Sequence, residues 1–195
     1  GLDVSDGLEF LNDRLATGAK LIATVGDAWA QRGSFEDLFA LYMGRKSLGW
    51  MKVHVTGLGR EAVDGFEVRF ESEVHMGEKA ETVIECSILS RAMELRSVER
   101  DETGDSGDHR ITSVKDGIWT TSTTRSARTH TRSGRVLPGM LPFSLSELIG
   151  WWTVPRGREV GTLLSLGKGL SASTLRFPED SLAIRFEDAT VSCRR

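Results

Sequence analysis

Residue types that could carry out covalent chemistry are sparse in this chain of 195 residues. Ser165 and Lys168 form a Ser-x-x-Lys pattern, in which a lysine can activate a serine nucleophile, but the Ser-Asp-Asn and Lys-Thr-Gly elements that accompany it in known enzymes are missing. The metalloprotease His-Glu-x-x-His, the hydrolase Gly-x-Ser-x-Gly, the phosphate-binding glycine loop and the Cys-x-x-Cys pair do not occur either. The sequence therefore predicts a protein that is not an enzyme and has no cofactor.

Histidines are the next candidates, because they serve as metal ligands and as acids or bases near neutral pH. The four histidines are scattered along the chain at positions 54, 75, 109 and 130. A metal site would require several of them to meet, together with carboxylates. We expect surface histidines and no metal.

Arginines form the only local cluster of positive charge. They are Arg125, Arg128, Arg132 and Arg135, with His130 among them. Guanidinium groups could receive an anion such as a phosphate or a lipid head group. Charged side chains also discourage an exposed edge strand from pairing with other molecules, and this edge role is the preferred interpretation.

Aromatic side chains are the candidates for binding a hydrophobic ligand. They are Trp119, Phe143, Trp151 and Trp152. Adjacent tryptophans after a short helix cannot easily all face one core, so one of them could line a pocket or cover its mouth. Packing in the core is the alternative, since aromatic residues dominate cores in general.

The elements that must position these residues are mostly strands. Phe66, Val68 and Phe70 alternate with charged residues, which is typical of a strand with one face on a core and one in water. Residues 39–74 predict a three-stranded meander, and Asp116-Gly117 is the strongest hairpin turn. Helical spacing predicts helices over residues 5–31 and 144–152. The charged, glycine-rich segment 99–109 predicts an exposed loop.

The predicted order is one helix, six or seven antiparallel strands, a short helix and about three further strands. Dedicated crossover helices, which parallel strands require, are missing. We therefore predict a mainly β (α+β) protein with one strongly curved antiparallel sheet, a half-barrel with the N-terminal helix and the short helix packed on its concave side. The predicted units are an N-terminal helical segment, 1–33, and an antiparallel half-barrel domain, 34–195.

Composition limits the classes of partner. The net charge of −3 predicts no general attraction to nucleic acid or to an anionic membrane, and no apolar run approaches the length of a membrane span. Cys86 and Cys193 could be two free buried thiols, which we prefer, or one long-range disulfide, which an exported protein would permit. The chain carries no export signal, so we expect that any such signal was removed or lies outside this sequence.

Three segments carry a resemblance to a known group. The segment Tyr42 to Trp50, the turn Asp116-Gly117-Ile118-Trp119, and the stretch from Leu141 through Leu163 resemble parts of uncharacterised exported bacterial proteins that are similar to the lipoprotein-carrier (LolA/LppX-like) half-barrels. The resemblance covers roughly residues 38–187. It implies an incomplete, strongly curved barrel in which helices plug an apolar cavity that holds acyl chains, and a periplasmic or cell-envelope location. The leading helix and segment 99–109 have no counterpart in it.

The functional expectation follows from this resemblance and from the lack of polar motifs. We expect a non-enzymatic envelope domain that binds a lipid or another hydrophobic small molecule in an apolar groove, where burial of acyl chain supplies the affinity. The alternative is an interaction or structural module without a ligand pocket, which docks another envelope protein through the sheet edge or the leading helix.

Overall fold

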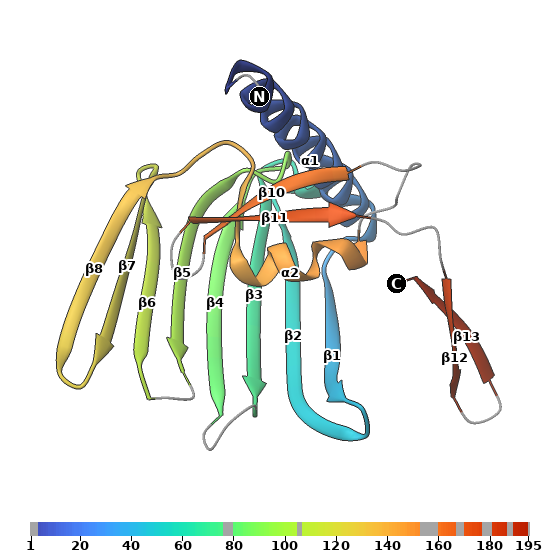
Figure 1. Ribbon diagram of the computed structural model, residues 1–195. Helices are drawn as coiled ribbons and strands as arrows, with labels where there is room; N and C mark the ends of the chain where they lie inside the picture. Colours follow the sequence, from blue (N-terminus) through green and yellow to red (C-terminus); the bar gives the residue numbers. More distant parts are fainter. Residues whose placement is uncertain are drawn as a thin grey trace.

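An open antiparallel sheet of eight strands forms most of the computed structural model, which describes residues 4–75, 80–104, 107–152, 160–166, 170–176, 181–186 and 189–194 (Figure 1). Its strands are β1 (Phe35–Met43), β2 (Lys46–Leu58), β3 (Gly65–Val74), β4 (Glu81–Leu89), β5 (Leu95–Thr103), β6 (His109–Lys115), β7 (Ile118–Arg125) and β8 (Arg128–Arg135). They follow one another in chain order across the sheet, so that β1 and β8 are its two edges. The prediction of a mainly β protein with an antiparallel sheet is confirmed, with eight consecutive strands where six or seven were expected.

The remaining elements are two α-helices, a 3₁₀ turn and five further strands. They are α1 (Val4–Arg32), η1 (Arg60–Ala62), β9 (Met140–Pro142), α2 (Phe143–Trp152), β10 (Val160–Leu166), β11 (Leu170–Arg176), β12 (Ser181–Phe186) and β13 (Ala189–Arg194). The predicted N-terminal helix and short helix are therefore confirmed. The predicted segment 5–31 lies within a single helix of 29 residues. Within the described residues, no helix combines the length and the apolar character that crossing a membrane demands.

One strand pair departs from the antiparallel pattern. β9 and β10 run parallel, with Leu164 opposite Met140, and α2 lies between them in the chain. Parallel strands require a crossover connection, and α2 is part of this one. β10 also pairs with β11 in antiparallel fashion, and β12 pairs with β13 as a separate hairpin.

Hairpin turns set the register of the sheet. Asp116 and Gly117 both have positive φ angles, 52° and 74°, and join Lys115 of β6 directly to its partner Ile118 of β7. Positive φ at both central residues is the requirement of the type I′ turn, whose twist matches that of the flanking strands. The predicted hairpin at this position is confirmed.

The hydrophobic core lies on one face of the sheet, which we call the inner face. Val55, Val68 and Val98 of β2, β3 and β5 are buried there, and Trp29 of α1 and Leu145 of α2 belong to the same core. Trp29 meets the rings of Phe35 and Phe66 edge-on, with centroids 5.7 and 5.5 Å away, a geometry that aromatic pairs prefer. The division into segments 1–33 and 34–195 stays a prediction, although α1 shares this core.

The end of α1 is fastened to the first strand by one side chain. Arg32, in the last helical turn, donates hydrogen bonds from both Nη atoms to the carboxylate of Asp37, at 3.0 and 2.7 Å, and lies 3.9 Å above the ring of Phe35. The hydrogen bond to Asp37 raises the pKa of Arg32, which outweighs the opposing effect of burial. A cation at a helix C-terminus also interacts favourably with the helix dipole.

Hydrophobicity alone does not show which face of β4 is buried. Its apolar residues Ile84 and Cys86 are exposed, whereas Glu85 and Ser87 are buried on the inner face. The preceding strand β3 has the expected polarity, with Phe66, Val68 and Phe70 buried. In the middle of the strand the inner face therefore changes from apolar to polar between β3 and β4, whereas Val83 and Leu89 of β4 stay buried in the core.

Gly26 allows α1 to lie close to the connection between β4 and β5. A Cβ atom added at this glycine would collide with the carbonyl oxygen of Arg91 and would lie 3.1 Å from Cγ of Met93, which is itself 1% exposed. Contacts that short are not tolerated in a packed interior without backbone movement. The glycine in the middle of this helix is therefore a packing requirement.

We expect Gly26→Ala to lower the free energy of unfolding by about 1–3 kcal/mol, the usual cost of overpacking. Helix propensity alone would act in the opposite direction, with a gain of about 1 kcal/mol for alanine over glycine. Urea denaturation followed by circular dichroism measures the sign. A more stable variant would show that α1 does not pack against residues 91–93 in this way.

Candidate functional site

Polar side chains replace the apolar core on part of the inner face of β4 to β8, beside a row in which Val98, Val114 and Trp119 remain in the core. The register places Glu85, Arg100, Thr112, Thr121 and Arg132 directly opposite one another on β4 to β8. A parallel row beside it contains Glu102, Arg110, Thr123 and His130 on β5 to β8. Residues opposite each other in antiparallel strands project to the same face. Two adjacent rows therefore form a polar stripe from the interior to the open edge at β8.

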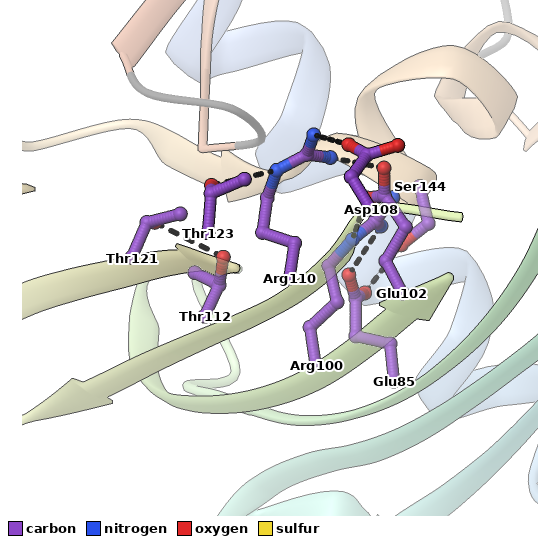
Figure 2. A network of polar contacts seen from close by, with 9 residues as sticks. All are labelled: Glu85, Arg100, Glu102, Asp108, Arg110, Thr112, Thr121, Thr123 and Ser144. Carbon is purple, nitrogen blue, oxygen red and sulfur yellow. Dashed lines mark hydrogen bonds and ion pairs between the residues drawn. The ribbon is translucent and has the colours of Figure 1, made fainter. Parts of the chain in front are cut away.

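A continuous set of ion pairs connects the buried members of this stripe (Figure 2). Arg100 donates from Nη1 to Glu85 and from Nη2 to Glu102, both at 2.9 Å. Arg110 donates to the other oxygen of Glu102 and, at 3.2 Å, to Asp108. The side chains of Glu85, Arg100, Glu102 and Arg110 are exposed by 6% or less. We call these residues, with Asp108, the buried ion-pair network.

Hydroxyl groups extend the network at both ends. Ser144, in the first turn of α2, donates a hydrogen bond across the core to Glu85. At the other end Arg110 donates to Thr123 at 3.4 Å, and Thr112 and Thr121 share a hydrogen bond of 3.0 Å (Figure 2). The network therefore fastens α2 to the sheet and continues toward β7.

Attraction between opposite charges offsets the cost of burying these side chains. Burial alone would lower the pKa of Arg100, but the attraction of Glu85 and then Glu102 outweighs it and raises the pKa above its ordinary value. Each carboxylate of Glu85 and Glu102 accepts a hydrogen bond from a guanidinium, which offsets part of the cost of burying its charge. The chemistry of the network is that of a structural clamp.

The prediction of an exposed loop over residues 99–109 is wrong for most of that segment. Residues 99–103 complete β5, and Arg100 and Glu102 are buried in the network. Composition predicted exposure because isolated charges cannot be buried, but here each charge meets its counter-ion. The alternation of Val98, Arg100 and Glu102, which matches that of Arg110, Thr112 and Val114, was the sequence signal that could have revealed the strands.

We expect Arg100→Met to lower the free energy of unfolding by about 3–5 kcal/mol at pH 7, because it leaves Glu85 and Glu102 buried without a counter-ion. The control Arg96→Met removes an exposed arginine of the same strand and is expected to cost less than about 0.5 kcal/mol. Chemical denaturation measures both. Equal effects of the two substitutions would show that the network contributes nothing specific.

Of the predicted aromatic ligand-binding residues, Trp119 lies in the hydrophobic core, 9% exposed, with its ring packed over Gly134 of β8. Phe143, Trp151 and Trp152 belong to α2, but their side chains lie outside the part that the structure describes. Their role as ligand-binding residues stays a prediction.

The predicted arginine cluster lies on the exposed hairpin of β7 and β8. Arg125 and Arg128 face each other across the turn, and Arg132 is opposite Thr121, so these three lie on the inner side of the hairpin. Arg135 is opposite Ile118 and projects to the other side. The register thus brings together three of the four arginines and places His130 between two of them.

The predicted scatter of the histidines agrees with their positions on the sheet. His54, His75 and His109 each lie beside one acidic residue, at 3.7, 2.8 and 2.7 Å. Within the described residues, no group of three or more His, Cys, Asp or Glu side chains is arranged to hold a metal ion. Lys168 of the Ser-x-x-Lys pattern lies outside the described residues, as does the side chain of Ser165.

The outer face carries a shallow depression of about 400 Å³ over β4, β5 and β6. Ile84 and Ile111 line it together with Cys86, Glu99 and Asp101. Cys86 is an exposed free thiol, so the expectation of a buried thiol is wrong for this residue, while the side chain of Cys193 is not described. Partial desolvation, and next the charge of Glu67, raise the pKa of the Cys86 thiol.

A thiol with a raised pKa contains less of the reactive thiolate at neutral pH. We therefore expect Cys86 to reach half its maximal rate of alkylation above pH 8.5, roughly the value of a free cysteine. Peptide mass spectrometry after timed iodoacetamide treatment would follow this residue alone. Glu67→Gln should shift the profile to lower pH, and a native profile at or below that of free cysteine would contradict the assignment.

A second groove lies beside α1 and has a volume of about 330 Å³. Its walls are α1, the connection between β4 and β5, and the connection between β8 and β9. The lining residues are Ala19, Lys20, Ile22, Ala23, Ala92, Met93, Glu94, Pro138 and Gly139. Most of them are apolar, and Lys20 and Glu94 supply one charge of each sign.

Comparison with known proteins finds no family model that matches this chain, and no curated protein or solved structure with significant similarity to it.

Proposed function

We propose that this protein is a non-enzymatic binding domain that holds a lipid or another hydrophobic small molecule in the groove beside α1. The observation that carries the proposal is the groove itself, which is lined mainly by alanine, isoleucine, methionine and proline. Its volume of about 330 Å³ lies at the lower end of ligand pockets, which begin near 300 Å³. A groove of this size suits one aliphatic chain.

The expected affinity follows from the apolar surface that such a ligand buries. Eight buried methylene groups would contribute roughly 6 kcal/mol, which corresponds to a dissociation constant in the range of tens of micromolar. Lys20 and Glu94 have opposite charges, so the groove does not select an anionic or a cationic head group. We therefore propose a ligand whose head group is neutral or zwitterionic.

The architecture also supports the proposal that the protein is a binding domain of the lipoprotein-carrier type. An open antiparallel sheet whose inner face is covered by helices is compatible with the half-barrel that the sequence resemblance implies. We propose on this basis a curved sheet of the lipoprotein-carrier type and a location in the periplasm or cell envelope. The polar stripe from β4 to β8 argues against an acyl chain along that part of the sheet, which is why the ligand is assigned to the groove at α1.

A double substitution that fills the groove tests the proposal. We expect Ala19→Leu/Ala23→Leu to weaken binding of a fluorescent fatty-acid amide at least tenfold, because the added side chains occupy the space of the ligand. The matched control Ala16→Leu/Ala28→Leu places the same groups on exposed positions of α1 that do not line the groove. Fluorescence titration measures both, and mass spectrometry of lipids extracted from the purified protein identifies the natural ligand. Equal affinity of the two variants would reject the groove as the binding site.

A specific observation also favours the alternative, an interaction module that docks another protein. The outer face exposes Ile84 and Ile111 on either side of Asp101 in the depression over β4 to β6, with exposed fractions of 57% and 50%. Exposed apolar groups of this kind occur at protein interfaces. Replacing both with threonine would leave lipid binding intact and abolish partner binding if this alternative holds.

A further inference from the structure

We propose that the inner side of the β7–β8 hairpin is a docking surface for anionic phospholipid membranes. Between residues 117 and 146 the chain contains four arginines and no aspartate or glutamate, although the whole chain has a net charge of −3. All of these residues lie in the part that the structure describes. The positive charge is therefore concentrated on one hairpin. This hairpin can attract an anionic membrane, although the net charge of the whole chain predicts no such attraction.

The arginines are available to an external partner. Arg125, Arg128, Arg132 and His130 are exposed, and within the described residues none of them forms an ion pair or a side-chain hydrogen bond. The arginines of the neighbouring strands, Arg100 and Arg110, are by contrast fully engaged by carboxylates. The same inner face thus ends at β8 in cations that lack a counter-ion.

The tip of the hairpin carries two features that oppose folding. Arg125 and Arg128 are directly opposite each other, and like charges at opposite positions destabilise a strand pair. The turn between them consists of Ser126 and Ala127 with φ angles of 48° and 62°, a region that residues other than glycine and asparagine rarely adopt. An anion that bridges the two guanidinium groups would relieve the repulsion.

Protection of the sheet edge does not account for this pattern by itself. β8 is an edge strand, as the preferred interpretation of the sequence requires, and charge discourages pairing at an edge. Protection of an edge requires charged side chains, but these can be positive or negative. The opposite edge, β1, carries the acidic residues Glu36 and Asp37, beside His54 and Arg32, so charge at an edge of this sheet is not of one sign. The uniform positive sign of β8 points to a partner with negative charge.

The spacing of the arginines favours a surface over a single small anion. Arg128 and Arg132 lie four residues apart on one strand, a separation of roughly 13 Å at the usual rise per residue. One phosphate can be held between Arg125 and Arg128, but it cannot also reach Arg132. A membrane presents many phosphates in one plane, which matches an extended and exposed row of cations.

The test uses the full chain and sedimentation with vesicles of phosphatidylcholine, with and without 30% phosphatidylglycerol. We expect binding only to the anionic vesicles, and less of it at 300 mM than at 50 mM NaCl, because salt screens the attraction. Arg128→Gln/Arg132→Gln should weaken binding roughly thirtyfold. Arg128→Glu/Arg132→Glu should weaken it further, and Arg128→Lys/Arg132→Lys should retain it.

The control is Arg45→Glu/Lys46→Glu, which changes the net charge by as much as Arg128→Glu/Arg132→Glu does, at exposed positions where the turn between β1 and β2 meets β2. It should alter binding less than threefold. Equal binding to neutral vesicles, an equal loss in the control, or retained binding by the Arg128→Glu/Arg132→Glu variant would each overturn the proposal.

Two further outcomes would assign the hairpin to another partner. Competition by 1 mM inorganic phosphate would indicate a single-anion site, and binding to single-stranded RNA without binding to vesicles would indicate a nucleic acid. The surface is independent of the hydrophobic groove, so Ala19→Leu/Ala23→Leu should leave sedimentation unchanged. The two proposals therefore fail separately.

Discussion

Burial of charge is the constraint on which the described part of this protein depends. Arg100 and Arg110 hold three carboxylates in an interior where an isolated ion would be prohibitively costly. Such a network is seldom the most stable way to fill a core, because apolar residues of similar volume often serve as well or better. What it imposes is registry, since each guanidinium must meet particular oxygen atoms on the adjacent strands. Strands β4 to β6 can then pair in one register only, and Ser144 fixes the start of α2 to the same set of contacts.

The inner face therefore has a graded composition along a single row. The row begins with Val53 and Phe70, continues through Glu85 and Arg100 to Thr112 and Thr121, and ends at Arg132. Its members are apolar where α1 and α2 supply the core, ionic where the charges are paired, and hydroxylic toward the edge. The unpaired cation comes last, at a residue that is exposed.

Much of the fold could be predicted from the sequence because most of its strands obey simple alternation. Phe66, Val68 and Phe70 indicated β3 and its buried face, and Asp116-Gly117 fixed one hairpin, since few turns accept positive φ at both central positions. The helix over residues 4–32 was visible in its apolar spacing. The packing role of Gly26 could not be predicted, because its contact with residues 91–93 cannot be read from local sequence.

The buried network could not be predicted by the same reasoning, because pairing across strands is a non-local property. Segment 99–109 has the composition of a solvated loop. Its charged side chains can be buried only because the strand register places them beside Glu85 and Arg110. Ile84 of β4 and Ile111 of β6 cause the opposite error. Their hydrophobicity predicts burial, but both lie exposed on the outer face. Hydrophobicity therefore identifies the buried face of β3, but not that of β4 or β6.

The paired and the unpaired arginines have a common physical origin and opposite consequences. A guanidinium enclosed by carboxylates, as in Arg100, has its attraction satisfied within the molecule and serves only to hold strands together. The guanidinium groups on β8 have no acidic residue near them in the sequence between positions 117 and 146. Their positive charge therefore acts on molecules outside the protein. Because the field of that charge is screened within about 10 Å at ordinary salt, it acts only on a partner that approaches the hairpin closely. Strand β8 is thus an edge without a pairing strand. Within the described sheet, it is also where exposed arginines remain for another molecule to neutralise.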